Sequence, residues 1–216
     1  MPENYPQSKK CPVAIIGRRE DTCNYEAALS RLGIPCFTTL SPNKIYSCGG
    51  VLLPGGGDIT PAFFGQKNNG SRHIDTELDI LQLEAVEQAI RCRKPVLGIC
   101  KGMQILNVFF GGTIIQHMED AVLHQYQNGD QMHDTAIVHG TFLYAIYGSS
   151  LVVNSAHHQC LGRLGKGLLL AQYASPSPAP EAIFHEKLPI YGVQWHPERL
   201  APDGDKLLCF FRSLLL

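Results

Sequence analysis

The sequence of 216 residues lacks a large net charge, a long apolar run and closely spaced cysteine pairs. Its 18 lysines and arginines nearly balance 19 aspartates and glutamates, so the chain offers no overall attraction to nucleic acid or to an anionic membrane. No run approaches the length that spans a bilayer, and residues 1–10 are polar without an apolar signal segment. These absences predict a cytoplasmic protein with no nucleic-acid or membrane partner.

The cysteines and histidines also lack the spacing of a metal site. The chain has 8 cysteines but no Cys-x-x-Cys pair, and several lie inside apolar runs, so we expect free thiols in a reducing compartment. Four histidines of the middle segment could suggest a metal: His117, His124, His133 and His139. They lack the paired short spacings of zinc ligands, so the sequence predicts neither a metal nor a cofactor.

The first half of the chain alternates short apolar runs with amphipathic segments. The chain is long enough for one large α/β domain, which we expect over residues 11–216 after a flexible tail at 1–10. Predicted strands cover residues 12–17, 34–38, 50–53 and 95–99, and predicted helices cover 25–32, 75–91 and 101–110. This alternation predicts an open, mostly parallel, flavodoxin-like sheet with flanking helices.

The second half has shorter apolar runs separated by turns. Further strands are expected at residues 113–115, 136–138, 151–153, 168–170, 181–184 and 190–194. The segments 63–72, 116–131 and 175–180 are expected to be loops or irregular, and residues 205–216 to form a closing helix. These strands predict a short antiparallel extension of the sheet.

The segment from Pro95 to Gln104 has the outline of a nucleophile elbow. An apolar run stops at Cys100, which has Gly98 and Gly102 two places before and after it, and a helix follows. A tight strand-to-helix turn needs small residues at those places because it brings backbones together. At a helix N-terminus, free amide donors and the helix dipole stabilise a thiolate. A buried packing cysteine is the alternative, and the flanking glycines favour a nucleophile.

Two other segments supply what a cysteine nucleophile needs. The glycine run Gly55-Gly56-Gly57 follows the strand at 50–53, at the sheet edge where ligands bind in open α/β folds, and can turn amides toward a bound group. His196 and Glu198 flank a proline after the last strand, and an extended backbone would place them on one side. Together the three segments predict acyl transfer through a thioester.

Four motifs of this sequence resemble those of a known family, and they occur in the family's order. They span residues 53–58, 98–104, 153–159 and 192–198. With the acidic helix at 75–91, they cover most of the chain. The sequence resembles class I glutamine amidotransferase domains, in the peptidase C26-like branch that includes γ-glutamyl-γ-aminobutyrate hydrolases.

The resemblance implies roles for residues of this chain. It implies a catalytic triad of Cys100, His196 and Glu198, with the Lys101 amide as one oxyanion donor. It also implies a substrate-binding group, which consists of Gln104, His157, His158 and Gln159. The second oxyanion donor should come from the glycine run: related chains have proline at the middle position, and proline has no N–H, so Gly55 or Gly57 is favoured over Gly56.

The expected activity is hydrolysis of a γ-glutamyl amide, with release of glutamate and an amine. The region from Gly17 to Gly50 is shorter than in many members of the branch, so γ-glutamyl-GABA, γ-glutamyl polyamines and other amides all stay open. A glutaminase subunit that delivers ammonia to a separate synthase is the first alternative, and a non-catalytic binding domain is the second. The sequence does not give the oligomeric state, so a homodimer stays open.

Overall fold

A nine-stranded mixed sheet forms the centre of the molecule. The computed structural model describes residues 11–175 and 177–215, so the tail predicted at 1–10 lies outside the described part. The parallel half of the sheet contains, in spatial order, β2 (Cys36–Thr39), β1 (Val13–Ile16), β3 (Gly50–Leu53), β4 (Val96–Ile99) and β11 (Ile190–Val193). The antiparallel half continues with β10 (Pro180–His185), β9 (Leu168–Ala174), β6 (Gln131–Ile137) and β7 (Ser150–Ser155).

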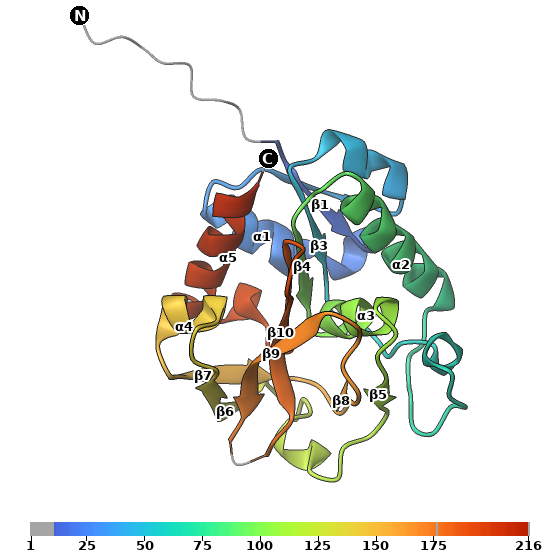
Figure 1. The fold of residues 1–216 in the computed structure, drawn as a ribbon, viewed down its shortest axis with the longest axis vertical. Helices are drawn as coiled ribbons and strands as arrows, with labels where there is room; N and C mark the ends of the chain where they lie inside the picture. Colours follow the sequence, from blue (N-terminus) through green and yellow to red (C-terminus); the bar gives the residue numbers. More distant parts are fainter. Residues whose placement is uncertain (1–10, 176, 216) are drawn as a thin grey trace, which may run out of the picture.

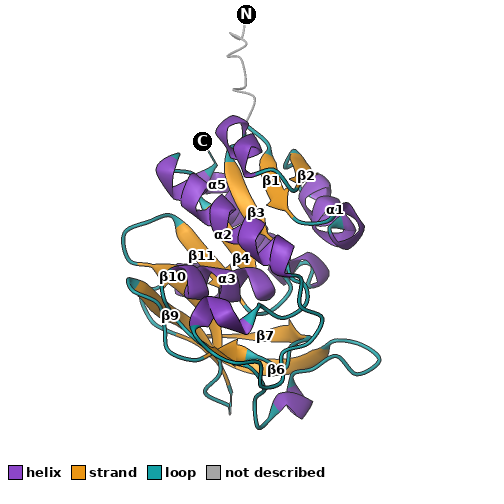
Figure 2. Ribbon diagram, turned by 90° about the vertical axis from the view of Figure 1, so that its right-hand side faces the viewer, coloured by secondary structure: helices purple, strands orange, loops and turns teal. Residues whose placement is uncertain are grey.

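Helices cover both faces of the parallel half. One face carries α1 (Cys23–Arg31) and α5 (Asp203–Leu214), and the other carries α2 (Thr76–Arg91) and α3 (Lys101–Phe109). Figure 1 shows α5 and α2 on opposite sides of the parallel strands, and Figure 2 shows the antiparallel strands continuing away from them. The flavodoxin-like α/β class predicted from the alternating pattern is therefore confirmed.

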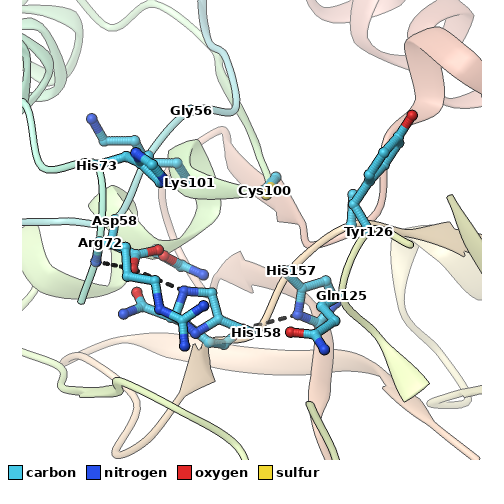
Figure 3. A pocket seen from close by; sticks show the side chains of 14 residues that line it. Gly56, Asp58, Arg72, His73, Cys100, Lys101, Gln125, Tyr126, His157 and His158 are labelled. Atoms are coloured by element: carbon cyan, nitrogen blue, oxygen red, sulfur yellow. Dashed lines mark hydrogen bonds and ion pairs between the residues drawn. The ribbon is translucent and has the colours of Figure 1, made fainter. Parts of the chain in front are cut away.

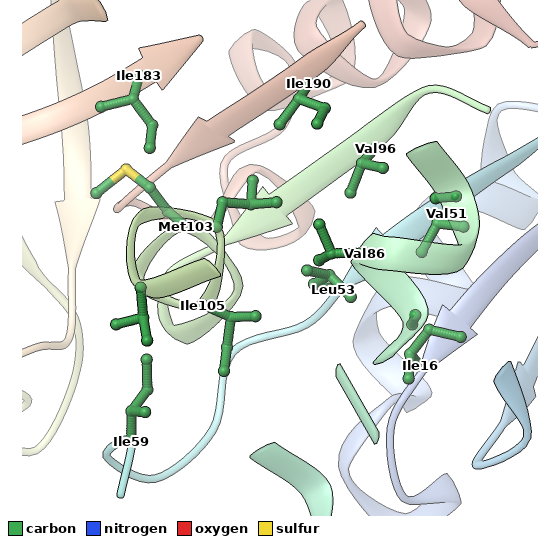
Figure 4. Close-up of a cluster of buried hydrophobic side chains, with 14 of the residues drawn as sticks. Ile16, Val51, Leu53, Ile59, Val86, Val96, Met103, Ile105, Ile183 and Ile190 are labelled. Atoms are coloured by element: carbon green, nitrogen blue, oxygen red, sulfur yellow. The ribbon is translucent and has the colours of Figure 1, made fainter. Parts of the chain in front are cut away.

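The two faces of the sheet have separate apolar cores because side chains alternate along each strand. Ala14 and Ile16 of β1 pack in the cluster with α2 and α3, whereas Val13 and Ile15 pack in the cluster with α1 and α5. Figure 4 shows the first cluster, where Met103 projects from α3 among strand side chains. Burial on both faces explains why β1, β3 and β4 are continuous apolar runs in the sequence, whereas the partly buried edge strand β2 ends in two threonines.

The antiparallel half differs most from the sequence prediction. β6 begins five residues before the predicted strand at 136–138, and β9 extends four residues beyond its prediction. A separate two-stranded ribbon pairs β5 (Ile114–Ile115) with β8 (Cys160–Leu161), and β8 was not predicted. The helix α4 (Phe142–Tyr147) was also missed. The antiparallel extension is thus larger than the short one expected.

Short 3₁₀ helices complete the described chain. They are η1 (Arg19–Asp21), η2 (Pro42–Ser47), η3 (Pro61–Phe64), η4 (Ala121–Leu123) and η5 (Pro197–Arg199). Of these, η4 lies in the segment predicted to be irregular. Among the described residues, no helix combines the length and apolar character that crossing a membrane requires.

Candidate active site

Cys100 lies at the sharp turn between β4 and α3. Its backbone has φ 52° and ψ −108°, a conformation that residues other than glycine seldom adopt and that is typical of a nucleophile elbow. The Cys100 amide donates to the Val193 carbonyl of β11 at 2.8 Å, which ties the turn to the neighbouring strand. The fold therefore places the sulfur at the carboxyl edge of the sheet and at the N-terminus of α3.

The glycines on either side of Cys100 are required by close packing. A Cβ at Gly98 would lie 2.5 Å from the carbonyl carbon of Gly102, and one at Gly102 would lie 2.1 Å from the Leu53 carbonyl oxygen. Both separations are far below van der Waals contact. The structure thus confirms that the turn needs a small residue two positions before and after the cysteine.

His196 and Glu198 form a buried pair beside the elbow. The Nδ1 atom of His196 lies 2.8 Å from Glu198 Oε1, which leaves Nε2 for Cys100. The predicted backbone is wrong: Pro197 starts the 3₁₀ turn η5, in which the Arg199 amide donates to the His196 carbonyl at 3.1 Å. A proline tolerates the first position of a helical turn because no partner is needed there for its missing N–H. The pair forms through this turn and not through strand alternation.

The surroundings of His196 favour its protonated form. Burial by itself lowers the pKa of His196, but the neighbouring Cys100 sulfur and the Glu198 carboxylate outweigh burial and raise the pKa from 6.5 to about 9. The imidazole is therefore charged at neutral pH. This is the charge state that a thiolate–imidazolium pair needs.

Asn154 holds the backbone of His196 from both sides. Its amide nitrogen donates to the His196 carbonyl at 3.0 Å, and its amide oxygen accepts from the His196 N–H at 2.8 Å. Asn154 is buried at the end of β7. Asn154 of β7, in the antiparallel half of the sheet, thereby positions His196, which comes after the parallel strand β11. Asn154 lies in the sequence motif at residues 153–159, but no role was predicted for it.

The glycine run contacts the Cys100 turn through Gly55. The Gly55 amide donates to the Tyr25 hydroxyl of α1 at 2.9 Å, and a Cβ at Gly55 would lie 3.0 Å from His196 Cε1. Burial, together with the nearby Glu198 and Cys100, raises the pKa of Tyr25 well above 10, so its hydroxyl stays protonated. Sequence reasoning missed Tyr25, because nothing in the α1 pattern separates it from a packing residue.

The other two glycines line the pocket. Gly56 and Gly57 are among its lining residues, and a Cβ at Gly57 would overlap the His73 carbonyl oxygen at 1.9 Å. The assignment of the second oxyanion donor to Gly55 or Gly57 stays a prediction, as does the role of the Lys101 amide.

The Lys101 side chain forms a buried ion pair. Its Nζ atom lies 2.7 Å from Asp79 Oδ1 of α2, and both side chains are buried. The other carboxylate oxygen accepts from the Thr60 amide at 2.8 Å and from the Thr60 hydroxyl at 2.7 Å. One carboxylate therefore connects the elbow to the segment that follows the glycine run.

A pocket of about 250 Å³ opens beside Cys100. Figure 3 shows Gly56, Lys101 and Asp58 on one side of it and Tyr126 and His157 on the other. Gln104 also lines the pocket and donates through Nε2 to Gln194 Oε1 at 3.2 Å. The pocket thus joins the nucleophile to polar and charged side chains of both signs.

The structure places the three predicted residues 157–159 on one wall of this pocket, each with different contacts. The Nε2 atom of His158 lies 2.9 Å from Asp58 Oδ2. Gln159 donates to the Ser71 hydroxyl at 2.9 Å and is almost fully buried. His157 directs Nδ1 to the Gln159 carbonyl and turns Nε2 away toward another buried group. Their role in substrate binding stays a prediction, with His158 the most accessible of the three.

Six further lining residues were not assigned to the site from the sequence: Asp58, Arg72, His73, Gln125, Tyr126 and Ala156. Asp58 directly follows the glycine run, and Arg72 ends the loop predicted at residues 63–72. Gln125 and Tyr126 lie in the segment predicted to be irregular, whose position depends on tertiary contacts. No sequence pattern could have identified them.

The comparisons with known proteins identify the family. The peptidase C26 family model matches residues 33–198, well over half of the chain. The chain therefore belongs to the peptidase C26 family, within the class I glutamine amidotransferase-like enzymes. It is a hydrolase or amidotransferase-type enzyme.

Individual relatives agree with this assignment. Protein NtpR of Enterococcus hirae is 31% identical over 182 residues, which cover 77% of this chain and 75% of NtpR. The gamma-glutamyl-gamma-aminobutyrate hydrolase of Escherichia coli O157:H7 is 31% identical over 163 residues, or 69% of this chain and 63% of that enzyme. The chain thus spans slightly less than two thirds of the latter's length. A glutamine amidotransferase from Thermotoga maritima shares the fold with a TM-score of 0.64 at 14% identity, covering 93% of this chain and 81% of its own.

Proposed function

We propose that this enzyme hydrolyses the γ-glutamyl amide bond of a small γ-glutamyl compound through a thioester on Cys100. The observation that carries the proposal is the meeting of Cys100 with the His196–Glu198 pair at the mouth of a polar pocket. Membership of the peptidase C26 family, and a relative named gamma-glutamyl-gamma-aminobutyrate hydrolase, support the substrate class.

The reaction proceeds in two halves. The Cys100 sulfur attacks the γ-carbonyl carbon, and the developing oxyanion accepts hydrogen bonds from the Lys101 amide and an amide of the glycine run. His196 then gives its proton to the amine, which leaves as the C–N bond breaks. In the second half, His196 takes a proton from water, the hydroxide attacks the thioester, and glutamate leaves as the sulfur regains its charge. Glu198 keeps the imidazole oriented throughout.

The charged pocket wall suits the amino-acid end of a glutamyl group. This end carries an ammonium and a carboxylate, and the pocket offers the Asp58 carboxylate and the Arg72 guanidinium. His158 Nε2 lies 2.9 Å from Asp58 Oδ2 and holds that carboxylate in the pocket wall. We place the α-ammonium near Asp58 and the α-carboxylate near Arg72, with Gln104 beside the γ-carbonyl.

A substrate panel tests the proposal. Purified protein is incubated with γ-glutamyl-GABA, a γ-glutamyl polyamine, other γ-glutamyl amides and glutamine, and glutamate release is measured for each. Turnover should be lost in Cys100→Ala and kept in Cys209→Ala, because Cys209 lies exposed on α5. A Cys100→Ala protein that releases amine at the original rate overturns the proposal.

The same panel separates hydrolysis of larger amides from the glutaminase alternative. If glutamine alone is cleaved, slowly, and a co-purifying synthase stimulates its cleavage many-fold, the chain is an ammonia-supplying subunit. A protein that forms no thioester with any member of the panel is a non-catalytic binding domain.

The 8 free thiols fit a reducing compartment, and a cytoplasmic location is part of the proposal.

A further inference from the structure

Three imidazoles surround a buried carboxylate behind the pocket wall. Glu181 of β10 is fully buried, and its Oε1 atom lies 3.3 Å from His133 Nε2, 3.6 Å from His157 Nε2 and 4.0 Å from His124 Nδ1. The ligand atoms of His124, His157 and Glu181 all lie within 4.8 Å of one another. Four segments far apart in the sequence therefore meet at one carboxylate.

Several polar atoms of this cluster have no hydrogen-bond partner among the described residues. They are both carboxylate oxygens of Glu181, both ring nitrogens of His133 and the Nε2 atom of His157. An unpartnered buried donor or acceptor costs about 1–3 kcal/mol, and more when it is charged. Of these atoms, His133 Nε2 and His157 Nε2 both face Glu181 Oε1, and a cation bound between them would satisfy all three.

The second ring nitrogen of His157 is arranged as in a metal-binding histidine. His157 donates through Nδ1 to the Gln159 carbonyl at 2.9 Å, which leaves Nε2 with a lone pair aimed at the cluster. His124 turns Nε2 toward Asp120 at 3.9 Å, and its Nδ1 lies 4.0 Å from Glu181 Oε1 and 3.4 Å from the Ser155 hydroxyl, which a metal ion would displace. In metal sites the second nitrogen of a histidine ligand usually donates to a carbonyl or a carboxylate, which fixes the tautomer.

The distances fit a small tetrahedral site. With metal–ligand bonds of about 2.0–2.1 Å, neighbouring ligand atoms of a tetrahedron are about 3.3 Å apart. The three nitrogens lie 3.3, 3.6 and 4.0 Å from Glu181 Oε1. His124, His157 and Glu181 form the mutually close group, and His133 would join it as the fourth ligand by rotation of its side chain about the contact with Glu181. We propose that His124, His133, His157 and Glu181 bind one divalent transition-metal ion, with Zn²⁺ the best match to three imidazoles and a carboxylate.

The ion would have a structural role. Four protein ligands close the coordination sphere, and a dication balances the buried Glu181 charge. His124 is followed directly by Gln125 and Tyr126, and His157 itself lines the pocket, so the ion would fix one wall of the active site. The proposal departs from the absence of a metal expected from sequence spacing, because these ligands are brought together only by tertiary structure. It does not depend on the proposed hydrolase activity.

A second pair of histidines lies nearby and must be distinguished. His117 Nδ1 lies 3.1 Å from His158 Nδ1, and His158 Nε2 contacts Asp58. His117 is exposed and His158 is partly accessible, so this pair could bind added metal at the surface. A His117→Ala variant removes this surface pair without touching the buried cluster.

Metal binding by the full chain tests the proposal. Chelator-treated protein is titrated with Zn²⁺ against a chromophoric chelator, and in parallel with Co²⁺, whose visible spectrum reports its geometry. We expect one ion per chain with a tetrahedral Co²⁺ spectrum. Glu181→Gln should weaken Zn²⁺ binding at least about tenfold, whereas His117→Ala and the exposed-histidine control His139→Ala should leave it unchanged.

Other outcomes overturn the proposal. These are the absence of stoichiometric binding by wild-type protein, an octahedral Co²⁺ spectrum, or binding that His117→Ala abolishes and Glu181→Gln preserves. If Glu181→Gln does not fold, the wild-type Co²⁺ spectrum still decides. His133→Ala then serves as the second variant, because His133 is the least buried ligand and water can replace it. Its Co²⁺ spectrum should shift and its Zn²⁺ affinity should fall.

Discussion

The buried Lys101–Asp79 pair gives the sharpest stability prediction. The side-chain exposures are 2% and 0%, so neither charge can be solvated if the other is removed. Replacing Asp79 by Asn keeps an oxygen for the two Thr60 donors but turns an NH₂ group toward the Lys101 ammonium. Breaking a buried pair in this way typically costs about 3–5 kcal/mol, and we expect Asp79→Asn to lose that much.

The matched double variant separates the charge from the packing. Lys101→Met alone leaves a buried carboxylate and should also cost about 3–5 kcal/mol. In Asp79→Asn with Lys101→Met both charges are gone and the Thr60 contacts persist, so the loss should fall to about 1–2 kcal/mol. The exposed pair Arg91–Glu87 is the control, and Glu87→Gln should change stability by less than about 1 kcal/mol.

Urea unfolding followed by the fluorescence of Trp195 measures the stability of wild type and of the four variants. Trp195 is the single tryptophan and is fully buried, so its emission reports the core near the site. The slope of the free energy against urea should stay constant across the set. If the double variant loses the sum of the two single losses, Lys101 and Asp79 are not coupled and the reasoning is refuted.

Three further predictions concern the proposed triad and the residue Asn154 that contacts it. Because the folded pKa of His196 is raised from 6.5 to about 9, its stabilising charge should be present in full below pH 6.5 and lost as the pH rises toward 9. The unfolding free energy should therefore fall more between pH 6.5 and pH 9 in wild type than in Cys100→Ala, because the variant lacks the sulfur that raises the pKa of His196. Equal losses in the two proteins contradict this. Glu198→Gln should lower kcat by up to about 10⁴-fold with KM little changed, measured by steady-state kinetics; a KM effect alone contradicts it. Asn154→Ala should lower kcat by about 10²-fold through displacement of His196, and an unchanged kcat would exclude its positioning role.

The parallel half of the fold was predictable because its inner strands β1, β3 and β4 are buried on both faces. Such strands are short apolar runs, and glycine or proline marks their ends, as at Gly50–Leu53. The antiparallel half was harder. β6 has the partly buried His133 and the buried Thr135 at its less exposed alternate positions, so its first half has no apolar pattern. α4 has the aromatic sequence of a strand, and only the Thr141 cap, which accepts from the Tyr144 amide, indicates a helix.

The residues of the candidate site likewise fall into those that a local sequence motif predicted and those that only tertiary contacts bring to the site. Cys100, His196 and Glu198 could be proposed because each lies in a local motif with its own spacing. Asn154 and Tyr25 could not be assigned roles, because their contacts cross from β7 and α1 to the site and leave no period or spacing in the sequence. The buried histidine cluster is an extreme case, with its carboxylate on β10.

The central claim is that Cys100 carries the γ-glutamyl group during turnover. Intact-protein mass spectrometry after rapid acid quenching of a reaction with a γ-glutamyl amide measures this directly. The account predicts a mass increase of one glutamyl group, located on the peptide that contains Cys100 and absent from Cys100→Ala. Release of glutamate without any such adduct, or an adduct that persists in Cys100→Ala, would contradict it.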